Sequence, residues 1–240
     1  MRVRELFLVT LLLLAVTLPA AAQEEEREGP WSGVATLGYL ATSGNTENSS
    51  LNTATEVKYT TGSWEHRARA KAINATEDDV TTSEAYDFGW KSTWNLSEFN
   101  YLFGRISWRK DRFSGYDQQL SETIGYGRRL VDRERHQLNA EIGAGARQSD
   151  LADGTEERET VVRAGLDYRW QISDTTEFRQ DIDVESGNEN TYLESVTALS
   201  ARLVGNISLV ASYTIKNNSD VPLATENTDT YTALSLEYTF

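Results

Sequence analysis

The 240-residue chain contains no cysteine, only three prolines and only two histidines. The lack of cysteine excludes a disulfide framework, thiolate metal sites and a cysteine nucleophile. Proline removes a hydrogen bond from a β-ladder, so its scarcity fits long, continuous strands. After the N-terminal residues, no run approaches the roughly 18 consecutive apolar residues of a membrane-spanning helix. The net charge of −14 argues against a nucleic-acid partner, because phosphate binding relies on clustered Lys and Arg.

The first 22 residues have the pattern of a secretory signal peptide. Arg2 and Arg4 give a positive start, residues 6–18 form an apolar core, and the alanines at 20–22 form a small-residue cleavage site. The core is shorter than the ~20 residues that a spanning helix needs, which argues against a membrane anchor. Residues 23–30, QEEEREGP, are charged and aperiodic, so we expect a short flexible periplasmic tail.

The last twelve residues, DTYTALSLEYTF, alternate strictly between two faces. Leu234, Leu236, Tyr238 and Phe240 lie on one face, which predicts a β-strand between two different environments. A chain that ends on such a strand and on Phe resembles the last strand of a bacterial outer-membrane β-barrel. In that resemblance, Tyr238 and Phe240 correspond to the signal that the barrel-assembly machinery reads.

From Trp31 onward the sequence contains about twelve strand-like segments. We place them at residues 31–42, 51–60, 64–73, 84–94, 99–110, 118–130, 136–148, 159–172, 176–185, 192–203, 207–216 and 229–240. Most exceed the ~9–11 residues that a tilted strand needs to cross the bilayer core, and short turns alternate with longer polar loops. The sequence therefore predicts an all-β fold over residues 31–240. We expect a transmembrane antiparallel up-and-down β-barrel of about 12 strands, with both termini on the periplasmic side.

Aromatic residues gather near the ends of the predicted strands: Trp31, Tyr59, Trp64, Trp94, Phe99, Trp108, Trp170, Phe178, Tyr213 and Phe240. Amphipathic rings sit at headgroup level in membrane barrels, so this placement predicts interface girdles. The alternative is the aromatic core of a secreted soluble barrel. Strands of about 5–6 residues would be usual in a soluble sheet.

The faces opposite the apolar ones carry charges of both signs in similar numbers. The candidate lumen-lining residues are Arg67, Arg69, Lys71, Asp87, Arg105, Arg109, Glu141, Arg163, Asp167, Arg169, Arg179, Asp181 and Asp183. A polar pore and a lumen closed by cross-strand ion pairs both explain them, because a buried charge requires a partner. We favour a narrow or occluded lumen. The acidic bias of the strand at 176–185 would make any leak cation-preferring.

Four glycines also fall inward on adjacent predicted strands: Gly125, Gly127, Gly143 and Gly145. They leave room for an inward aromatic side chain or a loop, or they allow strand curvature. The sequence leaves these interpretations open.

No motif indicates catalysis. His66 falls outward near a rim with Ser63 close in sequence, and His136 falls in a turn, but neither has the arrangement of a phospholipase triad. The acidic loops at 77–79, 150–157 and 220–229 lack calcium-loop spacing, so we expect solvated loops. We therefore predict no enzymatic activity, no cofactor and no metal. An outer-membrane lipid-modifying enzyme is the alternative.

Residues 38–47, GYLATSGNTE, lie at the first predicted hairpin. This segment, the W-x5-A-x-A pattern from Trp64 to Ala72 and the terminal YTF resemble a bacterial family of salt-induced outer membrane proteins whose function is unassigned. The resemblance covers essentially the whole mature chain and supplies no catalytic or ligand residues.

The resemblance implies an exported barrel in the Gram-negative outer membrane. We expect a monomer that contacts outer-membrane lipids and lipopolysaccharide, and the barrel-assembly machinery during biogenesis. Its expected role is envelope structure or a narrow, porin-like channel, linked to salt stress through the family name.

Overall fold

A computed structural model describes residues 29–42, 48–77, 80–112, 114–221 and 226–240. The predicted signal peptide, most of the predicted tail and the SGNTE segment lie outside these residues. The strands are β1 (Trp31–Thr42), β2 (Asn48–Thr61), β3 (Trp64–Glu77), β4 (Val80–Asn95), β5 (Asn100–Asp111), β6 (Tyr116–Arg133), β7 (His136–Leu151), β8 (Glu156–Ser173), β9 (Thr176–Ser186), β10 (Thr191–Val204), β11 (Ile207–Asn218) and β12 (Thr228–Thr239).

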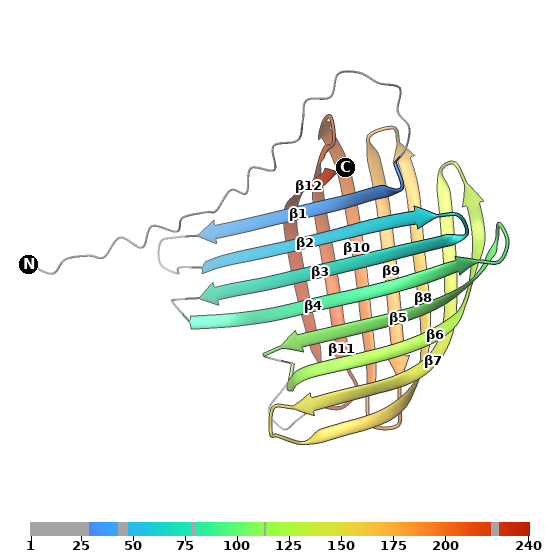
Figure 1. Ribbon diagram of the computed structural model, residues 1–240. Coiled ribbons are helices and arrows are strands. Elements are labelled where there is room, and N and C mark those ends of the chain that lie inside the picture. Colours follow the sequence, from blue (N-terminus) through green and yellow to red (C-terminus); the bar gives the residue numbers. More distant parts are fainter. Residues whose placement is uncertain (1–28, 43–47, 78–79, 113, 222–225) are drawn as a thin grey trace, which may run out of the picture.

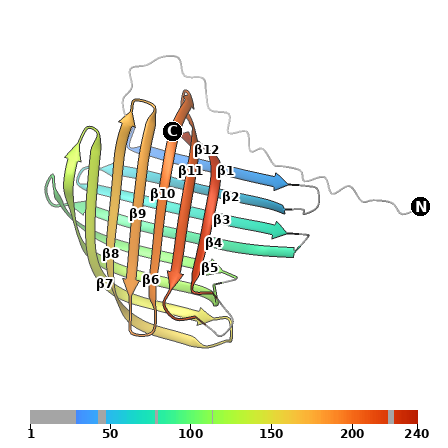
Figure 2. The same ribbon diagram turned by 180° about the vertical axis from the view of Figure 1, so that it is seen from behind.

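Each strand pairs antiparallel with its neighbours in sequence, and β1 pairs with β12, which closes the sheet into a barrel. This confirms the predicted all-β barrel and its twelve strands. In two opposite views, β1 to β5 form one wall that crosses a second wall made of β8 to β12 (Figures 1 and 2). Among the residues that the structure describes, no helix is long and apolar enough to cross a membrane.

The outside of the barrel carries the large apolar side chains that the alternation predicted. On β4, Tyr86, Phe88 and Trp90 are 40–46% exposed, and on β12 Leu234 is 61% exposed. No other part of the described chain covers these side chains. A hydrocarbon environment removes them from water, so the barrel presents the apolar outer band of a membrane protein.

At the end of the barrel away from the termini, several strands are longer than the sequence predicted. β3 continues to Glu77 and β4 begins at Val80, so most of the loop expected at 74–83 belongs to the paired strands. In the same way, β7 continues to Leu151 and β8 already begins at Glu156. Beyond the apolar band both strand faces are polar. Antiparallel pairing continues there without the alternation that marks a strand in sequence.

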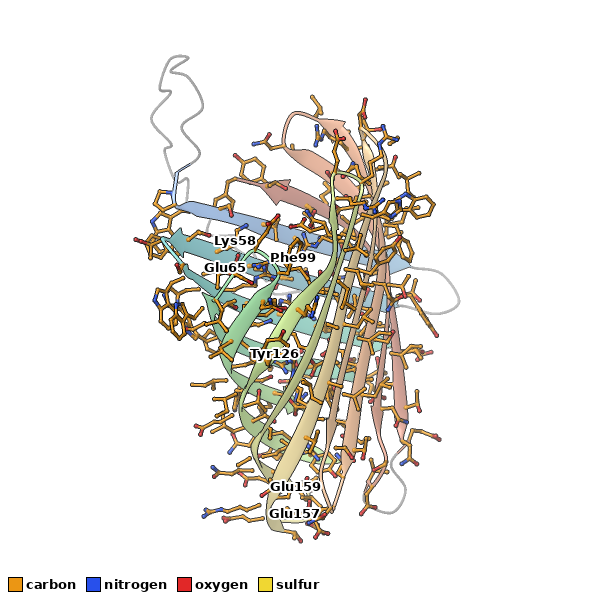
Figure 3. The ribbon with its side chains drawn as sticks, turned by 90° about the vertical axis from the view of Figure 1, so that its right-hand side faces the viewer. Lys58, Glu65, Phe99, Tyr126, Glu157 and Glu159 are labelled. Atoms are coloured by element: carbon orange, nitrogen blue, oxygen red, sulfur yellow. The ribbon has the colours of Figure 1, made fainter. Side chains whose placement is uncertain are left out.

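The inward glycines accommodate aromatic rings and also allow the strands to approach closely. A Cβ on Gly127 would lie 2.2 Å from the Tyr101 ring, and one on Gly125 would lie 2.6 Å from Phe103 Cζ. A Cβ on Gly145 would lie 1.8 Å from the Glu122 carbonyl oxygen. Both open interpretations of these glycines therefore hold. Figure 3 shows the strands curving past Tyr126, between the two walls.

Closure between β1 and β12 is short. Their register covers only residues 34–37 and 236–239, and Gly33 and Phe240 extend it by exchanging hydrogen bonds of 2.8 and 2.9 Å. Every other pair of adjacent strands shares a longer register, such as residues 31–42 with 48–59 between β1 and β2. The last strand thus closes the barrel as predicted, but along only part of its length.

Candidate functional site: an ion-paired lumen

The lumen contains a cavity of about 490 Å³. Its wall reaches Ser32, Lys58, Glu65 and Thr239 at the terminal end, where β1 begins and β12 finishes. Lys58 and Glu65 lie at that end of the barrel in Figure 3, whereas Glu159 lies at the opposite end. The cavity therefore opens along the axis from the terminal end.

The structure brings together all but one of the candidate lumen residues. The cavity wall contains Arg67, Arg69, Lys71, Asp87, Arg105, Arg109, Glu141, Arg163, Asp167, Arg169, Asp181 and Asp183. Arg179 is outside this wall and bonds to Glu237 at 3.0 Å. Strand parity therefore identified which side chains face inward, and their part in any function stays a prediction.

One group of ions centres on Glu141. Its carboxylate accepts hydrogen bonds from Lys91, from the Arg163 guanidinium at 2.8 Å and from the Tyr101 hydroxyl at 2.8 Å. Arg163 also contacts Asp183, which Arg105 reaches at 3.0 Å. Charges of opposite sign alternate through this chain of contacts, so each buried ion has a partner.

A second group centres on Glu185, which is fully buried. Arg109 donates to its carboxylate at 2.9 Å, Ser121 at 2.8 Å and Arg105 at 3.2 Å. Arg147 lies beside it, also fully buried, and pairs with Glu159 at 2.6 Å. This group fills the lumen between β5, β6, β7 and β9.

Two further ion pairs join the opposite walls of the barrel directly. Lys71 on β3 contacts Glu194 on β10 at 3.1 Å, and Lys216 on β11 contacts Asp87 on β4 at 3.2 Å. Such contacts require the walls to lie within the reach of two side chains. The lumen is therefore bridged rather than open across its middle.

A constriction lies where Arg109 stacks on Tyr192. The Arg109 guanidinium carbon is 3.8 Å from the centre of the Tyr192 ring, and both side chains are buried. Arg109 lines both the main cavity and a smaller one of about 20 Å³ beyond it, which is room for about one water molecule. The Arg109–Tyr192 layer thus ends the main cavity.

Comparison with known proteins places the whole barrel in a family. Residues 35–240 match the family described as "Protein of unknown function, DUF481". The chain belongs to this family. A relative, "Uncharacterized protein YdiY" of Escherichia coli (strain K12), is 35% identical over 221 residues, which cover 92% of this chain and 85% of that protein. This assignment confirms the resemblance to a family without an assigned function.

Two solved structures are similar to this DUF481 chain in fold. The translocator domain of autotransporter NalP from Neisseria meningitidis has a TM-score of 0.50 at 13% identity, covering 93% of this chain and 91% of that one. The COG4313 outer membrane channel from Pseudomonas putida F1 has a TM-score of 0.50 at 11% identity, covering 90% and 99%. These likenesses confirm the fold.

Three of the lumen residues that the sequence did not point to are Glu56, Tyr192 and Glu194. Glu56 pairs with Arg69 at 2.9 Å, and alternation along β2 could have placed it inward. Tyr192 and Glu194 belong to β10, where apolar residues occur on both faces. That mixture weakens the parity of the strand, and nothing in the sequence marks Tyr192 as the partner of Arg109.

The two histidines lie on the outer surface at the terminal end. His66 stacks on Trp64 with ring centres 5.9 Å apart, and its Nδ1 lies 2.9 Å from Ser92 Oγ rather than near Ser63. His136 begins β7, as the strand predicted at 136–148 has it, and its backbone pairs with Trp170 rather than belonging to the turn before it. Within the described residues, no three His, Cys, Asp or Glu side chains form a metal-binding group.

Proposed function

We propose that this chain is a narrow outer-membrane channel whose resting lumen is closed by the Arg109–Tyr192 layer. The observation that carries the proposal is a polar, charge-lined cavity that starts at one end of the barrel and stops at the Arg109–Tyr192 layer. With both termini in the periplasm, the cavity faces the periplasm. Displacement of the pair would connect it to the outside for small hydrophilic solutes.

Its ion selectivity is proposed to be weak. Cation preference, expected from the acidic strand at 176–185, requires carboxylates that are free to meet passing ions. Asp183 and Glu185 are instead held by Arg105, Arg109 and Arg163. Basic side chains slightly outnumber acidic ones in the cavity wall. A reversal potential near zero in a potassium chloride gradient supports this assignment, and a strong cation potential contradicts it.

Planar-bilayer conductance tests the channel. The variant Tyr192→Ala removes the ring against which Arg109 stacks, so we expect a larger single-channel conductance than that of the wild-type protein. Tyr213→Ala is the matched control, because Tyr213 is 44% exposed on the outer surface. Heat-modifiable gel migration verifies that each variant is folded. Equal currents from all three proteins contradict closure by the Arg109–Tyr192 layer. An absence of current from all three contradicts the channel and leaves a role in envelope structure.

A lipid-modifying activity is the second candidate, and the contact between His66 and Ser92 favours it. In such an enzyme, His66 would accept the proton of the Ser92 hydroxyl, although no carboxylate among the described residues orients the imidazole. Hydrolysis of phospholipid by the refolded protein, lost in both His66→Ala and Ser92→Ala, supports the enzyme. If the refolded protein hydrolyses no phospholipid, the lipid-modifying activity is excluded.

The link to salt stress rests on the family resemblance alone. A strain that lacks the chain should grow more poorly than its parent at high sodium chloride concentration. Equal growth contradicts this role without affecting the channel proposal.

A further inference from the structure

Two walls of the main cavity each carry a pair of like charges. Lys58 on β2 and Arg67 on β3 are register partners, and so are Asp167 on β8 and Asp181 on β9. Like charges directly opposite each other destabilise a sheet. All four side chains are half-buried and line the cavity. The stability of the sheet therefore explains neither pair, and we call them the basic pair and the acidic pair.

One positive charge is left over at the basic pair. Glu65 pairs with Arg67 at 3.0 Å, and Glu56 pairs with Arg69 at 2.9 Å. Lys58 has no acidic group within ion-pair distance in the described part of the chain. It lies at the terminal end of the barrel in Figure 3, where the cavity opens.

One negative charge is left over at the acidic pair. Arg169 lies 3.7 Å from Asp167, and Asn139 donates a hydrogen bond of 3.3 Å to the same carboxylate. Among the described residues, no cation lies within ion-pair distance of Asp181. The two carboxylates are within hydrogen-bonding reach of each other, so one cationic N–H donor between them could serve both.

The two excess charges face each other across the cavity without meeting. The charge of Arg67 acts on Asp167, and that of Arg69 acts on Asp181. No ion pair joins β2 or β3 to β8 or β9 within the described residues, whereas Lys71 on β3 does reach Glu194 on β10 at 3.1 Å. The space between the two pairs belongs to the cavity of about 490 Å³, a volume typical of small-molecule sites.

We propose that this part of the cavity binds a short zwitterionic peptide. Its ammonium group lies between Asp167 and Asp181, and Lys58 and Arg67 hold its carboxylate. One molecule with both charges is immobilised once, whereas a separate cation and anion are each immobilised. A single amino acid carries both charges on one carbon atom, so it would reach only one wall at a time.

The peptide would be a solute of the proposed channel, and the inference rests on that function only for entry from the periplasm. Binding is measured on the refolded protein in detergent micelles, without a current. A protein that conducts but does not bind refutes this inference alone. A protein that binds but does not conduct refutes the channel alone.

Isothermal titration calorimetry with three matched ligands tests the two ends of the peptide. Glycylglycine carries both charges, N-acetylglycylglycine lacks the ammonium group and glycylglycinamide lacks the carboxylate. We expect each analogue to bind about tenfold more weakly than glycylglycine, because each loses one charge-assisted contact. Undetectable binding of glycylglycine overturns the proposal. Equal binding of the acetylated peptide also does so, because the acidic pair would then share a proton rather than hold an ammonium group.

The variant Asp181→Asn shows which residues hold the ammonium group. It preserves the size of the side chain and breaks no ion pair, and heat-modifiable migration verifies that it is folded. It should bind glycylglycine about tenfold more weakly than the wild-type protein, and acetylation of the peptide should then have no further effect. The matched control is Asp174→Asn in the turn between β8 and β9, whose side chain is 98% exposed and which should bind as the wild-type protein does. If acetylation weakens binding equally in the wild-type protein and in Asp181→Asn, the proposal is wrong.

Discussion

Among the carboxylates of the lumen, Glu185 should be the one whose replacement by an amide destabilises the barrel most. Glu185 is fully buried and meets Arg105, Arg109 and Ser121. Glu185→Gln preserves the size of the side chain and removes its charge. The effect then depends on which arginines retain another acidic partner.

Only one arginine loses its counter-ion. Arg105 keeps Asp183 at 3.0 Å, and Arg147 keeps Glu159 at 2.6 Å. Arg109 has no other acid within ion-pair distance in the described part of the chain, and its side chain is 8% exposed. Removing one partner of a buried pair typically costs about 3–5 kcal/mol. Because Arg109 keeps its Tyr192 ring, we expect the lower end, about 3 kcal/mol in the free energy of unfolding.

Guanidinium titration of the refolded protein in lipid vesicles, followed by tryptophan fluorescence, measures this change. The matched control is Glu177→Gln on the same strand and the same face. Glu177 is 30% exposed and pairs with Arg179 at 3.4 Å, so its loss should cost below about 1 kcal/mol. If the two variants unfold at the same denaturant concentration, the Glu185 group does not hold the walls together and the reasoning is refuted.

Two further changes probe the wall and the closure. Gly127→Ala should destabilise the barrel by about 1–3 kcal/mol in the same titration, because its Cβ would lie 2.2 Å from the Tyr101 ring. The control is Gly104→Ala, which should leave the stability unchanged because a Cβ there would have nothing within 4 Å. Similar losses of stability in both variants would contradict the predicted clash with Tyr101. Deleting Phe240 removes the Gly33–Phe240 hydrogen bonds from an already short seam and should lower the amount of heat-modifiable barrel in cells, more than Phe240→Ala does. Wild-type amounts of the deletion protein would count against an assembly role.

The sequence was sufficient to predict where the strands lie and which residues belong to each of their two faces. On β3 and β9, Arg67, Arg69, Asp181 and Asp183 alternate with apolar residues, because one face meets lipid and the other meets the lumen. Because the two faces meet different environments, apolar and polar residues alternate with a period of two in the sequence. Inward charges were therefore predictable one strand at a time.

The partners of those charges were not predictable. Parity gives the face of a side chain, but not its height along the axis or the residue across the lumen. Lys71 and Glu194 are 123 positions apart in the chain and meet only because the two walls cross. The short closure was also not predictable, because the alternation of β12 continues through Leu234 although its register with β1 ends at Leu236.

The facing glycines of β6 and β7 have a consequence for aperture. The number and tilt of the strands set the perimeter of a closed sheet, but the area inside that perimeter depends on how round the cross-section is. Gly125 faces Gly143, and this glycine-lined turn of the wall lets the ring flatten until side chains span it. A twelve-stranded ring can thus enclose little more than a cavity of about 490 Å³. Strand number limits how wide this barrel can be, and its flattened cross-section, which the glycines of β6 and β7 permit, keeps the lumen narrow.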